Sequence, residues 1–422
     1  LDRSSAASDV YKRQCMDHII GREGRVIPAL VARRTPSMLF STWLGRTLHT
    51  TSRCSARVSR LHRADVNNAR RIRLTPPPSI FRALGFVGGV SAVTYLGCAA
   101  WSVRTNERIA RETDASISFS FFLGTRKNYE MLVQNDRAEQ WAQGYHRLAV
   151  SLQAWPHALR RACLCVYEKV ADTYLGLPTY QQAVVPLVAL HTAVFAAWML
   201  SPALRTTSLM YRLFTHRPAS GRVVTLLTSA TSHKGLAHFV LNNLALWSVG
   251  SCAIQALPRD KRDAQVEADT QPHFVAFYVA AGLFASLVSH LALAWRWRMV
   301  PKPAPRLARR ASLGASGAIY AAFALCACTM PHVQLSLVFL PMLTFPIKWG
   351  FGSLVLLDVV GAVRGWRVFD HVAHLGGAAF GFVYYLVGPS IWNACRGIYG
   401  IRRTNESQRV HEVGIPAAFR PW

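Results

Sequence analysis

Seven apolar blocks, each about 18 to 23 residues long, restrict the folds that this chain of 422 residues can adopt. The first block, residues 83–103, contains no charged residue. A helix of that length rises about 30 Å, which is the thickness of the hydrocarbon part of a bilayer. Basic stretches separate the blocks, and only 16% of all residues are charged, whereas about 25% is usual in a soluble domain. The pattern predicts an all-α, polytopic membrane protein.

One separate helix is expected before a bundle of six. The separate helix belongs to a segment at 76–104, and a polar, partly helical connection follows at 105–182. The six bundle helices are expected at 183–204, 235–257, 273–295, 312–330, 346–363 and 370–388.

The fifth bundle block is less regular than the others. Lys348 and Asp358 interrupt its apolar run, and residues 335–345 compete with it for the helix. The bundle is expected to cover 183–390, and a polar C-terminal tail is expected at 391–422.

Residues 1–75 are expected to be a basic arm that precedes the membrane domain. The chain starts at Leu1, so the first segment is expected to be non-native and Met16 to be the true start. Residues 17–75 contain 12 Arg, no Lys, three acidic residues and 11 Ser or Thr. This composition is typical of a mitochondrial transit peptide. A basic, unstructured tail with another role is the alternative.

The formal net charge of +27 does not indicate a nucleic-acid-binding protein. No zinc-finger spacing and no basic stripe interleaved with aromatic residues is present. Two cysteine pairs, Cys163 with Cys165 and Cys326 with Cys328, lack the second ligand pair that zinc needs. We therefore expect no nucleic-acid partner, no metal and no other cofactor.

A serine lies between glycines at the start of the fourth bundle block, in Gly314-Ala-Ser316-Gly317. Glycines allow close backbone packing and leave a backbone N–H free for a developing oxyanion. Small residues also pack membrane helices together without any catalytic role, so the motif alone leaves both interpretations open.

An ionisable residue opens the sixth bundle block, in His374-Leu-Gly-Gly377, with Gly381 one turn later. Gly377 and Gly381 form a small-xxx-small ridge that permits close approach of another helix. A histidine within a membrane span is by default a functional hypothesis. The alternative is a neutral histidine that only bonds a neighbouring helix.

Two polar residues lie one turn apart in the second bundle block, His238 and Asn242. A spacing of four places them on one face of a helix. Two donors on one face suit the oxyanion of a tetrahedral intermediate, and polar contacts between helices are the alternative.

Alternate helices of a serpentine bundle run in the same direction. His238, Ser316 and His374 lie about three or four residues inside the starts of the second, fourth and sixth blocks. All three are therefore expected at one depth, roughly 5 Å from one membrane face. Unrelated packing features would not be expected to coincide in this way.

At these residues the chain resembles the rhomboid intramembrane serine proteases. That family has HxxxN on its second core helix, GxSG on the fourth and AHxxG on the sixth, and this chain has each motif in the corresponding block. Three longer strings resemble the mitochondrial, presenilin-associated rhomboid-like branch, namely 312–319, 339–342 and 369–377. That branch has one helix before its six-helix core, so the resemblance implies a 1+6 arrangement.

The resemblance implies a catalytic dyad in which His374 takes the proton from Ser316. His238, Asn242 and the Ser316 backbone N–H would form the oxyanion hole. His371 is a rival base only three residues away, but the Ala-His-x-x-Gly context surrounds His374. The dyad needs no aspartate, so neither Asp358 nor Asp370 receives a role.

The resemblance further implies a multi-pass protein of the mitochondrial inner membrane that cleaves single-span membrane proteins in or near their transmembrane segments. The first and third bundle loops carry basic and no acidic residues, which favours a matrix-facing active site. Two alternatives are a catalytically inactive rhomboid-like protein that binds transmembrane segments, and a transporter. The natural substrates and the oligomeric state are left open.

Overall fold

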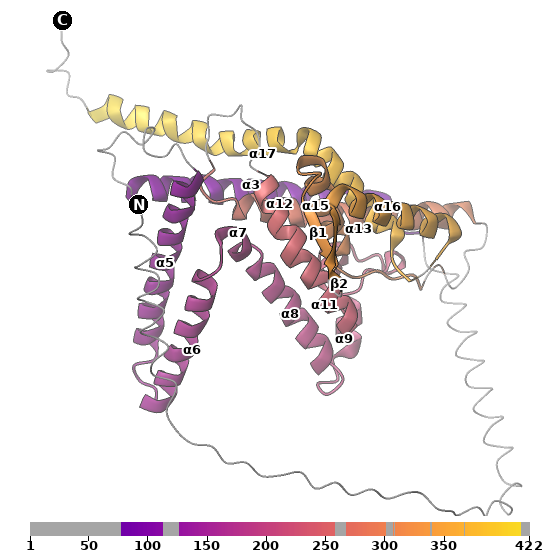
Figure 1. Cartoon of the computed structure of the whole chain (residues 1–422), viewed down its shortest axis with the longest axis horizontal. Helices are drawn as coiled ribbons and strands as arrows, with labels where there is room; N and C mark the ends of the chain where they lie inside the picture. The colour runs from indigo at the N-terminus through magenta and orange to yellow at the C-terminus, as the bar shows by residue number, and fades with distance from the viewer. Residues whose placement is uncertain are drawn as a thin grey trace, which may run out of the picture. The chain divides into compact units, whose positions relative to one another are not determined.

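Helices dominate the computed structural model of this protein (Figure 1). The structure describes residues 77–112, 126–257, 267–300, 307, 309–337, 340–366 and 368–414. The expected basic arm at 1–75 and the last eight residues of the expected tail lie outside this described part.

The long helices are α3 (Ile80–Glu112), α5 (Arg126–Ser151), α6 (His157–Leu175), α8 (Val185–Leu200), α11 (Leu236–Ala245), α13 (Gln271–Met299), α15 (Ser316–Thr329), α16 (Ile347–Arg364) and α17 (His371–Gly414). Shorter elements are α7 (Thr179–Gln182), α9 (Thr207–Leu213), η1 (Pro218–Ser220), α10 (Thr225–Thr228), η2 (Ser229–Thr231), the π-helical turn η3 (Leu246–Gly250) and α12 (Ser251–Ala256).

Five of the described helical segments are long and apolar enough to cross a membrane. They are Ile80–Ile109, Thr179–Leu200, Leu236–Ala256, Gln271–Met299 and His371–Gly400. The chain is therefore a polytopic helical membrane protein. α15 is apolar but has only 14 residues, and α16 carries Lys348, Asp358 and Arg364. The count of one plus six spans stays a prediction, because length and composition mark only five.

Glycines bring α15 into backbone contact with its two neighbours. A Cβ atom at Gly317 would overlap Ala285 of α13, and one at Gly377 of α17 would overlap the Gly317 carbonyl group. One turn deeper, a Cβ atom at Gly381 would overlap the Ala321 carbonyl group. These contacts leave no room for side chains, so they fix how α15 and α17 are aligned along their axes.

A two-stranded antiparallel sheet corrects the expectation of an all-α chain. β1 (Gln334–Leu337) pairs with β2 (Leu340–Pro346), and Gln334 lies opposite Pro346. Alternating polar and apolar residues in β1 match the two-residue period of a strand, and the prolines in β2 disfavour a helix. The segment at 335–345 therefore forms this hairpin, and the helix that follows it begins at Ile347.

α17 continues well past the predicted end of the sixth block. It runs from His371 to Gly414 and contains Pro389. The start of the expected polar tail is thus continuous with the helix that carries His374.

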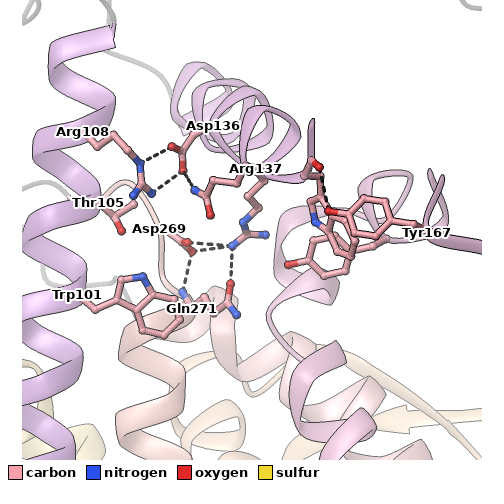
Figure 2. A pocket seen from close by; sticks show the side chains of 11 residues that line it. Trp101, Thr105, Arg108, Asp136, Arg137, Tyr167, Asp269 and Gln271 are labelled. Atoms are coloured by element: carbon pink, nitrogen blue, oxygen red, sulfur yellow. Dashed lines mark hydrogen bonds and ion pairs between the residues drawn. The ribbon is translucent and has the colours of Figure 1, made fainter. Parts of the chain in front are cut away.

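The polar connection forms the helical pair α5 and α6, and α5 is anchored to the bundle by a buried arginine. Arg137 donates to both carboxylate oxygens of Asp269 at 3.0 Å and to the side-chain oxygen of Gln271 at 3.0 Å (Figure 2). A second ion pair joins Arg108 of α3 to Asp136 of α5. These pairs line a pocket of about 350 Å³ among α3, α5, α6 and the start of α13.

Candidate active site

Ser316 is the first residue of α15, and the turn before it depends on a glycine. Gly314 has a φ of +131°, in the region that favours glycine. A Cβ atom there would also lie 2.8 Å from Cε1 and 2.9 Å from Nε2 of His238. Gly314 therefore permits both the turn and the close approach of the His238 ring beside Ser316.

His374, near the start of α17, lies against this serine. Its Nε2 is 2.8 Å from the Ser316 Oγ, which is hydrogen-bond distance. The ring stacks on Tyr320, one turn along α15, at 4.3 Å between centroids and 12° between planes. Two residues 58 positions apart in the chain thus meet, as the predicted common depth of their helices requires.

An aspartate that sequence reasoning left without a role completes a line of hydrogen bonds. Asp358 of α16 is 2% exposed, and its two carboxylate oxygens lie 3.1 and 3.2 Å from Nδ1 of His374. Ser316, His374 and Asp358 therefore have the connectivity of a Ser-His-Asp triad.

One sequence signal did point to Asp358. It is an acid within an otherwise apolar block, and such a residue is rare unless it has a partner or a function. The signal did not identify the partner, because nothing in the local pattern places α16 against α17.

His371, the rival base, also lies against Asp358. Its Nδ1 is 2.5 Å from Asp358 Oδ1, and its ring packs where a Cβ atom at Gly361 would otherwise lie. The Ser316 hydroxyl hydrogen-bonds Nε2 of His374 and not His371. His371 therefore contacts the Asp358 end of the line Ser316–His374–Asp358.

The two predicted oxyanion donors are placed differently. His238 lies beside Gly314, whose Cβ position is 3.9 Å from the Ser316 Oγ. Asn242 is 8% exposed and donates through Nδ2 to the His238 carbonyl oxygen at 2.8 Å, within its own helix. Since the first N–H groups of a helix have no acceptor inside it, the start of α15 adds backbone donors to this region.

His233, which sequence reasoning also missed, supports the turn before Ser316. His233 is fully buried, and its Nε2 accepts from the Ala315 N–H at 3.2 Å. Burial, and then the neighbouring His191 and His238, lower the pKa of His233 to about 3. The ring is therefore neutral and able to accept. Its position before a helix rather than within a motif gave no signal for this role.

Within the described residues no cluster of three or more His, Cys, Asp or Glu side chains is arranged to hold a metal ion. A hydroxyl bonded to an imidazole, with a buried carboxylate on the other ring nitrogen, can perform nucleophilic catalysis at a carbonyl group.

Comparison with known proteins identifies the same family that the sequence motifs resemble. A family model described as a rhomboid domain matches residues 220–390. The chain is 29% identical over 322 residues to presenilin-associated rhomboid-like protein A, mitochondrial, of Danio rerio, covering 75% of this chain and 73% of that protein. It is 34% identical over 227 residues to presenilin-associated rhomboid-like protein, mitochondrial, of Homo sapiens, covering 53% of each.

A more distant relative is rhomboid protein 1, mitochondrial, of Saccharomyces cerevisiae. It is 29% identical over 206 residues, which cover 47% of this chain and 51% of that protein. The matched part of this chain thus spans about half the length of the human and yeast relatives.

Proposed function

Residues 220–390 of this chain form a rhomboid domain, and on that premise we propose that the protein is an intramembrane serine endopeptidase. Its substrates are membrane-anchored proteins that it cleaves in or near a single transmembrane segment. The observation that carries the proposal is the 2.8 Å hydrogen bond between His374 Nε2 and Ser316 Oγ. A catalytically inactive binding protein would have no need to keep the Ser316 hydroxyl and the His374 imidazole within hydrogen-bond distance of each other.

In the proposed mechanism His374 accepts the hydroxyl proton of Ser316 as the oxygen attacks the substrate carbonyl. The imidazolium then gives that proton to the leaving amine, and an acyl-enzyme remains. A water molecule, deprotonated by the same ring, releases the product and restores the serine.

Asp358 is proposed to hold the His374 ring in the required tautomer. Its carboxylate only accepts hydrogen bonds, so Nδ1 of His374 carries a hydrogen and Nε2 is left free to accept from Ser316. The buried carboxylate also stabilises the imidazolium that forms during attack. This role goes beyond the dyad that the family resemblance implies.

The oxyanion is proposed to form on the side of Ser316 where His238 lies. The His238 ring and the backbone N–H of Ser316 are the nearest donors. The amide of Asn242, one turn deeper, is bonded to the His238 carbonyl oxygen. We therefore assign Asn242 a supporting part, in which it orients the first turn of α11 and with it the ring.

A serine-directed probe tests the proposal directly. A fluorophosphonate should label the full chain in detergent or liposomes, and peptide mass spectrometry should locate the adduct at Ser316, because His374 raises the nucleophilicity of that hydroxyl. The Ser316→Ala variant is the control for non-specific labelling. Absence of labelling in folded wild-type protein would favour the inactive binding protein instead.

We also propose that the protein resides in the mitochondrial inner membrane. The Arg-rich, acid-poor composition of residues 17–75 supports this location, as does the similarity to mitochondrial proteins. A fusion of residues 16–80 to a fluorescent protein is expected to enter mitochondria. Diffuse cytosolic fluorescence from that fusion would contradict the proposed location.

A further inference from the structure

A buried chain of hydrogen bonds begins at the first turn of α3. His290 of α13 has its Nε2 3.2 Å from the carbonyl oxygen of Ser79, the residue directly before α3. Its Nδ1 lies 3.0 Å from Nε2 of His216, in the loop between α9 and η1. The two histidines are only 3% and 1% exposed. The start of α3 is therefore joined through α13 to the loop that follows α9.

The backbone of His216 extends this series of hydrogen bonds to the segment that carries Ser316. Its N–H donates to the Ser312 carbonyl oxygen at 2.9 Å, and its carbonyl oxygen accepts from the Ser312 N–H at 3.0 Å. Ser312 lies four residues before Ser316. Between them the Gly314 N–H donates to the Ser229 carbonyl oxygen at 2.9 Å. A displacement of His216 therefore acts on the short segment that positions Ser316.

The Ser79 carbonyl oxygen, at one end of this series of hydrogen bonds, determines which atom donates in each of them. The Ser79 carbonyl only accepts, so His290 Nε2 carries the hydrogen and, in a neutral ring, its Nδ1 accepts from His216. The Thr225 hydroxyl donates to the Arg222 carbonyl oxygen at 2.7 Å and lies 2.8 Å from His216 Nδ1, so its single hydrogen is shared between these two acceptors. Burial, and then the nearby His290, lower the pKa of His216 to about 3, so its ring is neutral in this arrangement.

A second contact holds the same end of α3. Arg298, near the end of α13, donates to the Pro78 carbonyl oxygen at 3.2 Å and to the Ala294 carbonyl oxygen of its own helix at 2.8 Å. α3 and His216 both precede residue 220, where the match to the rhomboid family model begins. The helix before the domain is thus tied to α13 by two side chains that lie within the domain.

We propose that the start of α3 belongs to the catalytic scaffold. His290 and His216 are positioning residues, because they link that start to the segment that carries Ser316. This inference rests on the proposed function, because positioning affects a rate only where Ser316 is the nucleophile. Without His290, the Nε2 hydrogen of His216 would be buried with no acceptor. The His216 loop would then shift to satisfy it and would take Ser312 with it.

The His290→Leu variant of the full chain tests the proposal. We expect kcat to fall about 30-fold, KM to stay within about twofold, and fluorophosphonate labelling of Ser316 to slow by a similar factor, as for loss of a buried hydrogen-bond partner. His290→Gln is expected to restore kcat to within about threefold of wild type, because its amide can donate to Ser79 and accept from His216. Unchanged kcat and labelling in His290→Leu would overturn the inference.

Thr105→Val is the matched control at the other end of α3. Thr105 is 2% exposed and its hydroxyl has no hydrogen-bond partner in the described structure, so the variant is expected to keep wild-type kcat. An equal loss in Thr105→Val and His290→Leu would show that general packing of α3 matters and would remove the role of the histidines. If His290→Leu does not accumulate, Thr225→Val tests the same series of hydrogen bonds at its other end, where Thr225 contacts His216. This variant is expected to lower kcat with KM unchanged.

Hydrogen exchange separates this inference from the proposed function. In the Ser316→Ala background, His290→Leu is expected to speed exchange of the Ser312 amide about tenfold, because its acceptor, the His216 carbonyl oxygen, lies on the displaced loop. Unchanged exchange at this amide would overturn the inference even where the wild type labels at Ser316. Faster exchange in a protein that neither labels nor cleaves would retain the link to α3 and reject the proposed protease.

Discussion

The Ser316→Ala variant is expected to lose cleavage of a helix-destabilised single-span substrate by about 10⁴- to 10⁶-fold, the range seen when a serine nucleophile is removed. In the proposed mechanism the hydroxyl oxygen of Ser316 forms the acyl-enzyme, and the alanine side chain has no group that could replace it. Because the change removes one oxygen atom at the start of α15, protein level and thermal stability are expected to remain near those of wild type. The measurement is cleavage of the purified substrate in liposomes, followed on gels.

His374→Ala and His371→Ala form a matched pair for the same experiment. Both histidines lie near the start of α17 and both bond Asp358, but only His374 bonds Ser316. We expect His374→Ala to abolish cleavage and probe labelling, and His371→Ala to retain at least about a tenth of the wild-type rate, since it leaves the Ser316–His374 bond in place. The reverse pattern would reject the assignment of the base, and full activity of Ser316→Ala would reject the nucleophile.

Removal of an oxyanion donor should give a smaller loss than removal of the nucleophile. His238→Ala is expected to lower kcat by about 10²- to 10³-fold, as for other single oxyanion-hole donors. Asn242→Ala should lose less, because its amide bonds its own helix and acts on the site through His238. A larger loss in Asn242→Ala than in His238→Ala would reverse these two roles.

The Asp358→Asn variant is expected to lower kcat by about 10²- to 10⁴-fold with little change in KM. An asparagine amide at this place can donate to His374 Nδ1, which favours the tautomer with hydrogen on Nε2. That nitrogen could then no longer accept the proton of Ser316. The effect is on the chemical step, so kcat from initial rates is the quantity to measure, with a melting curve for each variant to exclude unfolding.

Asp370→Asn is the control for this prediction. Asp370 accepts from Ser289 at 2.7 Å and from the Ala373 N–H at 3.2 Å, so it caps the start of α17. We expect this variant to keep a stability near that of wild type, because asparagine caps a helix about as well as aspartate, and to leave kcat within about threefold. Wild-type kcat in a folded Asp358→Asn protein would show that the Ser316–His374 dyad suffices, as the family resemblance implies.

The sequence by itself determined the features that depend on local composition. Apolar blocks of membrane-spanning length identify helices because each helix satisfies its own backbone hydrogen bonds within lipid. Ser316 and His374 were found because glycine motifs mark close helix contacts, and because alternate helices of a serpentine chain share a direction. The depth at which these residues lie follows from counting along each helix.

Only the tertiary structure decided which polar groups meet, since those pairs lie on different elements. Asp358 bonds a histidine 16 positions later, Ala315 bonds one 82 positions earlier, and His290 bonds a carbonyl oxygen 211 positions earlier. The anchoring of α5 by Arg137 is likewise a product of packing. The bounds of an apolar block report how far a residue lies along its own helix, but which side chain of another helix it meets is decided only when the neighbouring helices pack around it.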